Sequence, residues 1–112
     1  LGAKVLILGF TFKEDCPDLR NSRVIDVIKE FADLGMEVDV FDPWADPQRA
    51  KDAYGIELTH SPQGDTYDAI VLTVAHTEFK SLGTAIRAWG KAKHVLFDTK
   101  GVLPGDTADG RL

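Results

Sequence analysis

The chain has 112 residues, a length typical of one domain, and its 44% of hydrophobic residues is too high for a disordered chain. A net charge of −5 argues against a dedicated nucleic-acid binder, and no apolar run approaches the roughly 20 residues that cross a bilayer. The single cysteine, Cys16, excludes an internal disulfide framework and a zinc site built on paired cysteines, and we expect no metal ion.

The first half of the chain predicts two strands and two helices. Residues 3–8 form an almost continuous apolar run, which is typical of a strand buried on both faces of a parallel sheet. After a charged, irregular stretch, Ser22 can cap a helix whose apolar residues recur at helical spacing up to Gly35. Residues 37–41 alternate as a strand does, and residues 46–54 predict a short helix.

The second half continues the alternation of strands and helices. We expect a brief strand at 56–58, a buried strand at 69–74, short helical turns within 79–89, a buried strand at 94–97 and a frayed tail over 104–112. Such alternation predicts an α/β fold, namely a three-layer, Rossmann-like parallel sheet with helices on both faces. We expect residues 1–112 to form a single domain.

Ligands of such sheets bind beyond the carboxyl ends of the strands, so the segment after the first strand is the first candidate site. A dinucleotide-binding fold would show G-x-G-x-x-G there, with glycines that let the backbone approach a pyrophosphate. Here only Gly9 is present, Phe10 and Phe12 follow it, and residues 10–21 separate the strand from its helix. We therefore expect no NAD site in this domain.

What the same loop does offer is an aromatic ring and two cations. Phe12 can stack on a base or sugar, Lys13 can meet a phosphate as a point charge, and Arg20 can bind phosphate through two nitrogens. The alternative is that Phe10 and Phe12 are core residues, while both cations pair in solvent with the acidic residues of the loop, Glu14, Asp15 and Asp18. The residues by themselves leave these two interpretations open.

The other strand ends carry weaker signals. Asp42 stands where dinucleotide folds place a ribose-binding acid, but proline follows it, which favours a turn. Asp98 and Lys100 could face the same pocket as Lys13 or neutralise each other. His76 has no partner at metal-ligand or catalytic spacing, so a local hydrogen-bonding role is favoured, and we expect no catalytic residue within the chain.

Residues 8–22 resemble a known family pattern. A strand, then Gly-x-x-Phe-Lys, then Asp-x-Arg-x-Ser opening a helix, is similar to the C-terminal, UDP-binding domain of the UDP-glucose/GDP-mannose dehydrogenase family. Later motifs also resemble that family: Phe41-Asp42-Pro43, Tyr67-Asp68-Ala69 and Phe97-Asp98-x-Lys100. Together the motifs cover about residues 3–103. The 16–21 stretch, Cys-Pro-Asp-Leu-Arg-Asn, resembles the branch that acts on UDP-N-acetylhexosamines for bacterial surface polysaccharides.

The resemblance implies that the chain is one part of a longer cytoplasmic, homo-oligomeric enzyme. Such an enzyme oxidises the C6 alcohol of a UDP-sugar to a carboxylate in two NAD-dependent steps. NAD binds an N-terminal domain, a central helical region forms the dimer, and the catalytic cysteine and lysine also lie outside this domain. The chain alone should therefore be inactive, and its expected partners are a UDP-sugar (UDP-N-acetylhexosamine or UDP-glucose) and the two missing domains, with neither nucleic acid nor membrane.

The resemblance also implies roles for particular residues. Phe12, Lys13 and Lys100 would contact the UDP-sugar, with Lys13 near the diphosphate or the sugar. Another set, Asp18, Arg20 and Ser22, would hold the loop and the start of the helix in place. The alternatives are a phospho-receiver-like module, for which residues 69–76 supply no aspartate at the strand end, and a subunit-interaction module without nucleotide binding.

Overall fold

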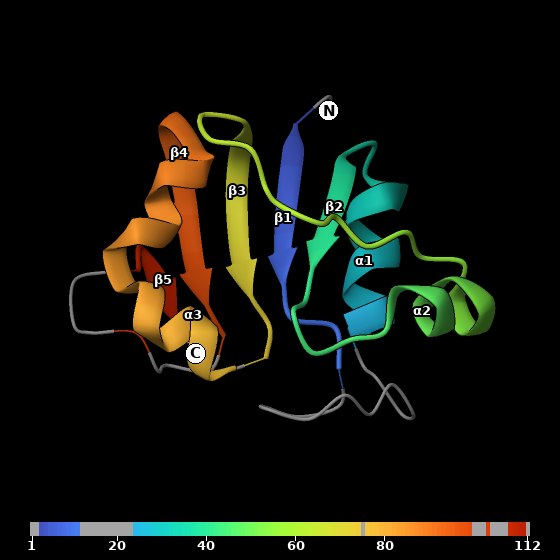
Figure 1. Ribbon diagram of the computed structural model, residues 1–112. Coiled ribbons are helices and arrows are strands. Elements are labelled where there is room, and N and C mark those ends of the chain that lie inside the picture. Colours follow the sequence, from blue (N-terminus) through green and yellow to red (C-terminus); the bar gives the residue numbers. More distant parts are fainter. Residues whose placement is uncertain (1–2, 12–23, 75, 100–102, 104–107, 112) are drawn as a thin grey trace.

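The computed structural model describes residues 3–11, 24–74, 76–99, 103 and 108–111, and in this part five strands form one sheet. The strand order is β2-β1-β3-β4-β5, and every pairing is parallel (Figure 1). The strands are β1 (Lys4–Leu8), β2 (Glu37–Phe41), β3 (Tyr67–Leu72), β4 (Gly90–Asp98) and β5 (Gly110–Arg111). This order reverses direction between β1 and β3, which creates a switch point where the two strands end.

Helices cover both faces of the sheet, as the sequence predicted. They are α1 (Val24–Asp33), α2 (Pro47–Tyr54), α3 (Thr77–Leu82) and the 3-10 helix η1 (Gly83–Trp89). Side chains of β1 alternate between two buried clusters: Val5 and Ile7 pack with α1 and α2, whereas Leu6 and Leu8 pack with α3 and η1. This alternation explains the continuous apolar run at the start of the sequence and confirms the three-layer α/β prediction.

Local sequence signals account for the helix boundaries. Asp46 caps α2 by accepting a hydrogen bond from the Gln48 amide at 2.9 Å, and Pro47 occupies the first turn. Gly55 ends α2 in the left-handed conformation, with φ at +70°. In α1, Val24 and Ile28 are buried against the sheet. The predicted cap of α1, Ser22, lies outside the described residues.

The structure departs from the sequence prediction in four strands. β3 (Tyr67–Leu72) begins and ends two residues before the strand expected at 69–74. β4 begins at Gly90 instead of residue 94, with a register shift against β3 between Tyr67 and Ala69. The brief strand expected at 56–58 is a single bridge between Leu58 and Val40. β5 falls inside the 104–112 segment that we expected to fray, of which residues 104–107 are not described.

Contacts of Asp109 attach the segment just before β5 to β4 and η1. The Asp109 carboxylate accepts a hydrogen bond from the Leu96 amide at 2.9 Å and lies 2.9 Å from a guanidinium nitrogen of Arg87. The Asp109 amide donates in turn to the Leu96 carbonyl at 2.7 Å. These contacts join residues that are distant in the sequence, so no local pattern predicted β5.

Tyr67 anchors the amino end of β3. Its ring is 2% exposed, its hydroxyl donates to Asp39 Oδ2 at 2.7 Å, and the Lys4 ammonium lies 5.7 Å from the ring centroid. Burial and the neighbouring carboxylate raise the pKa of the Tyr67 hydroxyl well above its ordinary value. The phenol therefore remains a hydrogen-bond donor over the whole working pH range.

We expect Tyr67→Phe to lower the free energy of unfolding by about 1–2 kcal/mol, which is below most of the range of about 1.5–3 kcal/mol for a hydrogen bond to a charged group. Asp39 is half-exposed and water can replace part of the lost contact, which keeps the cost modest. Urea denaturation of the variant and the wild type measures the difference. An unchanged midpoint would show that the hydroxyl contact makes no net contribution.

None of the helices among the described residues is both long and apolar enough to cross a membrane.

Candidate functional site

The carboxyl ends of β1, β2, β3 and β4 meet along one edge of the sheet, at the bottom of Figure 1. At the switch point, Gly9 follows β1 with φ at +108° and packs against Val74. A Cβ atom at Gly9 would lie 2.6 Å from Val74 Cβ and 2.7 Å from the Val74 amide nitrogen. The Thr73 hydroxyl lies 2.6 Å from the Gly9 carbonyl oxygen, which ties the segments after β1 and β3 together.

Asp42, directly after β2, presents a buried carboxylate to the start of the first loop. Its Oδ2 accepts hydrogen bonds from the amides of Phe10 at 2.6 Å and Thr11 at 2.9 Å. Its Oδ1 accepts from the amides of Trp44 at 2.7 Å and Ala45 at 3.2 Å. One oxygen therefore makes the local turn expected after Asp42-Pro43, while the other binds backbone more than thirty residues away.

His76, after β3, completes this cluster. Its Nε2 lies 2.9 Å from Asp42 Oδ2 and 3.1 Å from the Thr11 hydroxyl, and the side chain is fully buried. Because a carboxylate only accepts, Nε2 carries the hydrogen of the Asp42 contact. The imidazole packs between Trp44, at 6.1 Å between ring centroids, and Phe79, at 5.5 Å.

The Asp42 carboxylate is held in its charged form. Burial by itself raises the pKa of Asp42, but the hydrogen bonds from His76, Phe10 and Thr11 outweigh it and bring the pKa below its ordinary value of 3.8. Asp42 is therefore an anion whose hydrogen-bonding capacity serves the protein's own backbone and His76.

The end of β4 is also tied to its neighbour. Both the amide and the hydroxyl of Thr99 donate to the Leu72 carbonyl oxygen, at 3.1 and 2.7 Å. Asp98 is fully buried, and its Oδ2 accepts from the Leu103 amide at 2.8 Å. The chain thus leaves β4 immediately beside the end of β3.

Two predicted sets lie wholly outside the described residues: the ligand contacts Phe12, Lys13 and Lys100, and the loop-positioning residues Asp18, Arg20 and Ser22. The described residues that precede Lys13 and Lys100 in the sequence are Thr11, after β1, and Thr99, after β4. β1 and β4 both flank β3, so these two strand ends are about two strand spacings, roughly 10 Å, apart. The two predicted cationic positions, Lys13 and Lys100, thus follow strand ends on the same edge of the sheet.

The described start of the first loop does not fit the pyrophosphate of a dinucleotide. On its Cβ side, Gly9 packs against Val74, so this glycine serves the contact between the chain segments that follow β1 and β3. Phe10 is fully buried in the core, and the oxygens of Asp42 already bind backbone amides, so they are poorly placed to receive ribose hydroxyls. The described residues at this position are therefore unsuited to bind a dinucleotide.

Sequence analysis missed the cluster of Thr11, Asp42 and His76. It favoured a turn for Asp42 and a local hydrogen bond for His76, and both are present, but the non-local contacts were not foreseen. The signal was available, since Asp42 and His76 are the first strongly polar residues after two parallel strands that flank β1.

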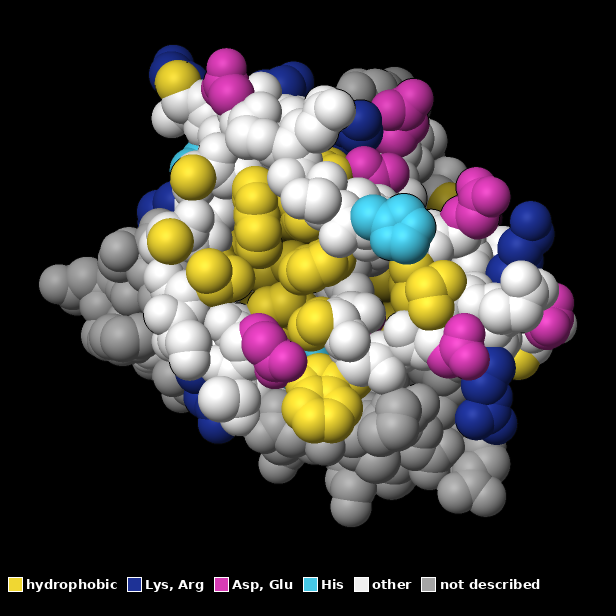
Figure 2. Space-filling view, viewed as in Figure 1, with side chains coloured by type: hydrophobic (Ala, Val, Ile, Leu, Met, Phe, Trp, Pro, Cys, Tyr) yellow, Lys and Arg dark blue, Asp and Glu magenta, His cyan; other side chains and the backbone are white. Residues whose placement is uncertain are grey.

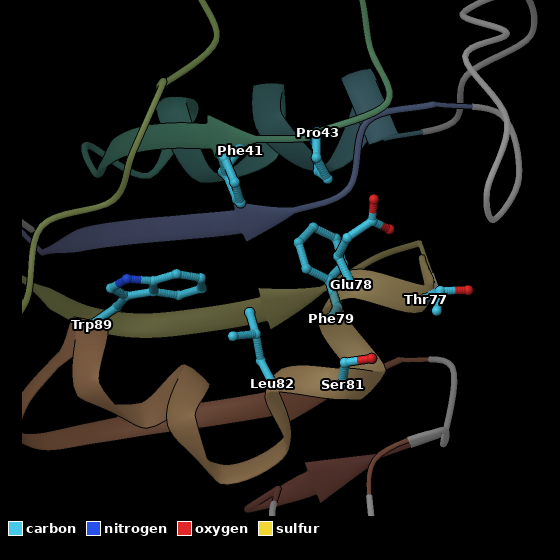
Figure 3. Close-up of a pocket in the computed structure, with 8 residues that line it drawn as sticks. All are labelled: Phe41, Pro43, Thr77, Glu78, Phe79, Ser81, Leu82 and Trp89. Atoms are coloured by element: carbon cyan, nitrogen blue, oxygen red, sulfur yellow. The ribbon is translucent and has the colours of Figure 1, made fainter.

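A second feature is an apolar groove of about 490 Å³ on the face covered by α3. Figure 2 shows the hydrophobic area at the centre of this face, and Figure 3 shows side chains of β2, α3 and η1 pointing into it. It is lined by Phe41, Pro43, Thr77, Glu78, Phe79, Ser81, Leu82 and Trp89. Glu78 is the one charged side chain in this lining, so the groove is unsuited to a diphosphate.

Among the described residues, no three His, Cys, Asp or Glu side chains gather as ligands for a metal ion.

Comparison with known proteins identifies the relatives of this chain. Residues 6–105 match the profile of the UDP-glucose/GDP-mannose dehydrogenase family, UDP binding domain. The chain is 51% identical over 99% of its length to a UDP-N-acetyl-D-glucosamine 6-dehydrogenase of Pseudomonas aeruginosa, and 36% identical over 94% to Protein CapL of Staphylococcus aureus. It spans about a quarter of these relatives, 26% and 25% of their lengths.

Solved structures show the same architecture. The native structure of the UDP-N-acetyl-mannosamine dehydrogenase Cap5O from Staphylococcus aureus superposes with a TM-score of 0.74 at 26% identity, over 99% of this chain and 26% of that one. A ternary complex of GDP-mannose dehydrogenase from Pseudomonas aeruginosa superposes with a TM-score of 0.72 at 20% identity, over 97% of this chain and 28% of that one, which shows the shared fold.

Proposed function

We propose, since this chain belongs to the UDP-glucose/GDP-mannose dehydrogenase family, that it is the domain of a longer enzyme that binds the nucleotide part of a UDP-sugar. The observation that carries the proposal is the 51% identity to a UDP-N-acetyl-D-glucosamine 6-dehydrogenase along 99% of the chain. The site at the carboxyl ends of the strands supports the proposal, because Lys13 follows β1 and Lys100 follows β4, and these two parallel strands end on the same side of the sheet.

The proposed parent enzyme oxidises the C6 alcohol of its UDP-sugar to a carboxylate. That change removes four electrons through an aldehyde, consumes one water, and requires two NAD molecules as hydride acceptors. NAD would bind the N-terminal domain, and the catalytic cysteine and lysine would also lie outside this chain. Residues 1–112 would therefore be inactive alone and contribute ligand binding to a cytoplasmic homo-oligomer that serves polysaccharide biosynthesis.

Within this proposal, Phe12, Lys13 and Lys100 contact the UDP-sugar. An aromatic ring and two cations match a ligand that joins a flat base to a diphosphate. Asp18, Arg20 and Ser22 position the loop and the start of α1. Two of the relatives are a UDP-N-acetyl-D-glucosamine 6-dehydrogenase and a UDP-N-acetyl-mannosamine dehydrogenase, which favours a UDP-N-acetylhexosamine as the sugar nucleotide.

A titration followed by amide-resolved NMR tests the proposal. UDP is added to the ¹⁵N-labelled 112-residue chain, with NAD as the control ligand, and affinities in the millimolar range, about −4 kcal/mol, remain measurable. We expect shifts confined to residues 10–20 and 98–101 with UDP alone. A response of the first loop to NAD would contradict the proposal, and so would silence of these segments towards UDP.

We expect Lys13→Ala to weaken UDP binding by about 1.5–3 kcal/mol, because it removes a charge-assisted contact to phosphate. The fold should be unchanged. The matched control is Lys51→Ala, which removes the same charge from α2, where Lys51 makes an exposed ion pair of 3.9 Å with Glu57. Both variants are titrated with UDP under the same conditions. Equal affinity of the two variants would remove Lys13 from the site.

A further inference from the structure

The cluster of Thr11, Asp42 and His76 connects three strand ends by side-chain contacts that the turn after β2 does not need. The Asp42 Oδ1 contacts to Trp44 and Ala45 are sufficient to form that turn. The Oδ2 atom is used for Phe10, Thr11 and His76, which lie 31 to 34 residues away in the sequence. Asp42 Oδ2 thus binds the backbone at the start of the first loop and the His76 ring.

His76 extends this support to the side chain of Thr11. Its Nε2 is 2.9 Å from Asp42 Oδ2 and 3.1 Å from the Thr11 hydroxyl oxygen. The ring cannot turn away easily, because it is fully buried between Trp44 and Phe79. Its backbone is also held: the His76 carbonyl accepts from the amides of Phe79 and Lys80 at the start of α3. His76 is therefore a rigid donor aimed at the loop entrance.

We propose that Asp42 and His76 are positioning residues for the UDP-binding loop, which they hold at its first residues, Phe10 and Thr11. This inference rests on the proposed function, because Phe12 and Lys13 follow Thr11 directly in the sequence. Fixing both amides and the hydroxyl at the entrance limits the directions in which the chain can continue. Holding Phe10 and Thr11 in place before a ligand binds reduces the conformational entropy that binding costs at these two residues.

A pair of His76 variants separates positioning from packing. Both His76→Gln and His76→Met lose the ring that contacts Trp44 and Phe79, but only glutamine keeps an N–H donor near the place of Nε2. UDP is titrated into the 112-residue chain well below the melting temperature of each variant. We expect His76→Met to weaken UDP binding about tenfold, which corresponds to about 1.4 kcal/mol, and His76→Gln to stay within about threefold of wild type.

Tyr67→Phe serves as the stability control, since Tyr67 lies at the amino end of β3, on the opposite edge of the sheet from Asp42. It should lower the melting temperature while leaving the UDP dissociation constant unchanged. Should His76→Met fail to fold, Thr11→Val and Thr11→Ser repeat the comparison: valine removes the hydroxyl that lies 3.1 Å from His76, and serine keeps it. Weaker UDP binding by the valine variant alone is then expected.

The outcomes distinguish this inference from the function on which it rests. If the wild-type chain binds no UDP, the proposed function fails and the inference falls with it. If the wild type binds UDP and both His76 variants bind equally well, or are weakened equally, the inference is overturned and the UDP site stands. Selective loss in the methionine variant, with rescue by glutamine, supports positioning by the hydrogen bond.

Discussion

We expect Gly9→Ala to lower the free energy of unfolding by about 3 kcal/mol or more, through backbone strain together with steric overlap. At φ of +108° an alanine is strained, and its Cβ would come within 2.7 Å of both the Cβ and the amide nitrogen of Val74. The backbone nitrogen cannot move aside without disturbing the end of β3. Chemical denaturation measures the loss, and a variant without a cooperative transition would exceed this expectation.

Gly55→Ala is the matched control for the glycine at the switch point. Gly55 also has a positive φ, +70°, but a Cβ atom built there has no neighbour within 4 Å. Its free energy of unfolding should therefore fall only by the cost of placing alanine in the left-handed conformation, about 1–2 kcal/mol. Similar losses in the two variants would contradict the packing argument for Gly9 and Val74.

We expect Asp42→Ala to lower the free energy of unfolding by about 3–5 kcal/mol, because it leaves buried donors without their acceptor. Four backbone amides and the His76 ring bind this single carboxylate. The control is Asp46→Ala, only four residues later, which removes an ordinary helix cap from an exposed site at about 1 kcal/mol. A loss at Asp42 no larger than that at Asp46 would refute the account of the cluster.

The Asp42 carboxylate also makes the free energy of unfolding decrease as the pH is lowered in the acid range. The folded pKa of Asp42 lies below its ordinary value of 3.8, so at pH values between the folded pKa and 3.8 the unfolded chain binds a proton that the folded chain does not. This contribution is present above pH 3.8 and is lost as the pH falls through the folded pKa. Asp42→Asn should therefore show a shallower decline of stability in acid. Parallel slopes for variant and wild type would count against it.

The comparison of slopes is needed because other carboxyl groups titrate in the same range. The hydrogen bond from the Lys4 amide, with help from Lys91, lowers the pKa of Asp68, and Arg87 and the Leu96 amide lower that of Asp109. Both carboxyl groups are on the surface and remain in the Asp42→Asn variant. The difference between the two slopes therefore isolates Asp42.

Much of the architecture could be predicted because its signals are local. The apolar run of β1, the capped and glycine-ended α2, and the alternating β2 each carry their period or boundary in adjacent residues. Together these short elements favour one topology class, because parallel strands must be connected by crossovers. Family motifs then identified the UDP-binding domain, and the family profile over residues 6–105 confirmed it.

The sequence predicted where in the fold a candidate site lies, but it did not predict which residues contact one another there. The rule that ligands bind at the carboxyl ends of parallel strands directs attention to the ends of β1, β2, β3 and β4, where Asp42 and His76 lie. It could not show that Asp42 would turn one oxygen towards Phe10 and Thr11, because Asp-Pro is sufficient to explain a turn. The predicted ligand contacts at Phe12, Lys13 and Lys100 stay predictions.

The sequence by itself determined the fold class, the two-sided burial of β1, the extent of α2 and the family, since each depends on neighbouring residues or on motifs of fixed spacing. Only the tertiary structure decided what Gly9, Asp42 and His76 do. Their non-local contacts span 31 to 65 residues and exist only because the order β2-β1-β3 brings three strand ends together. A hydrogen bond of that span has no local period, and its partners are set by strand order and register.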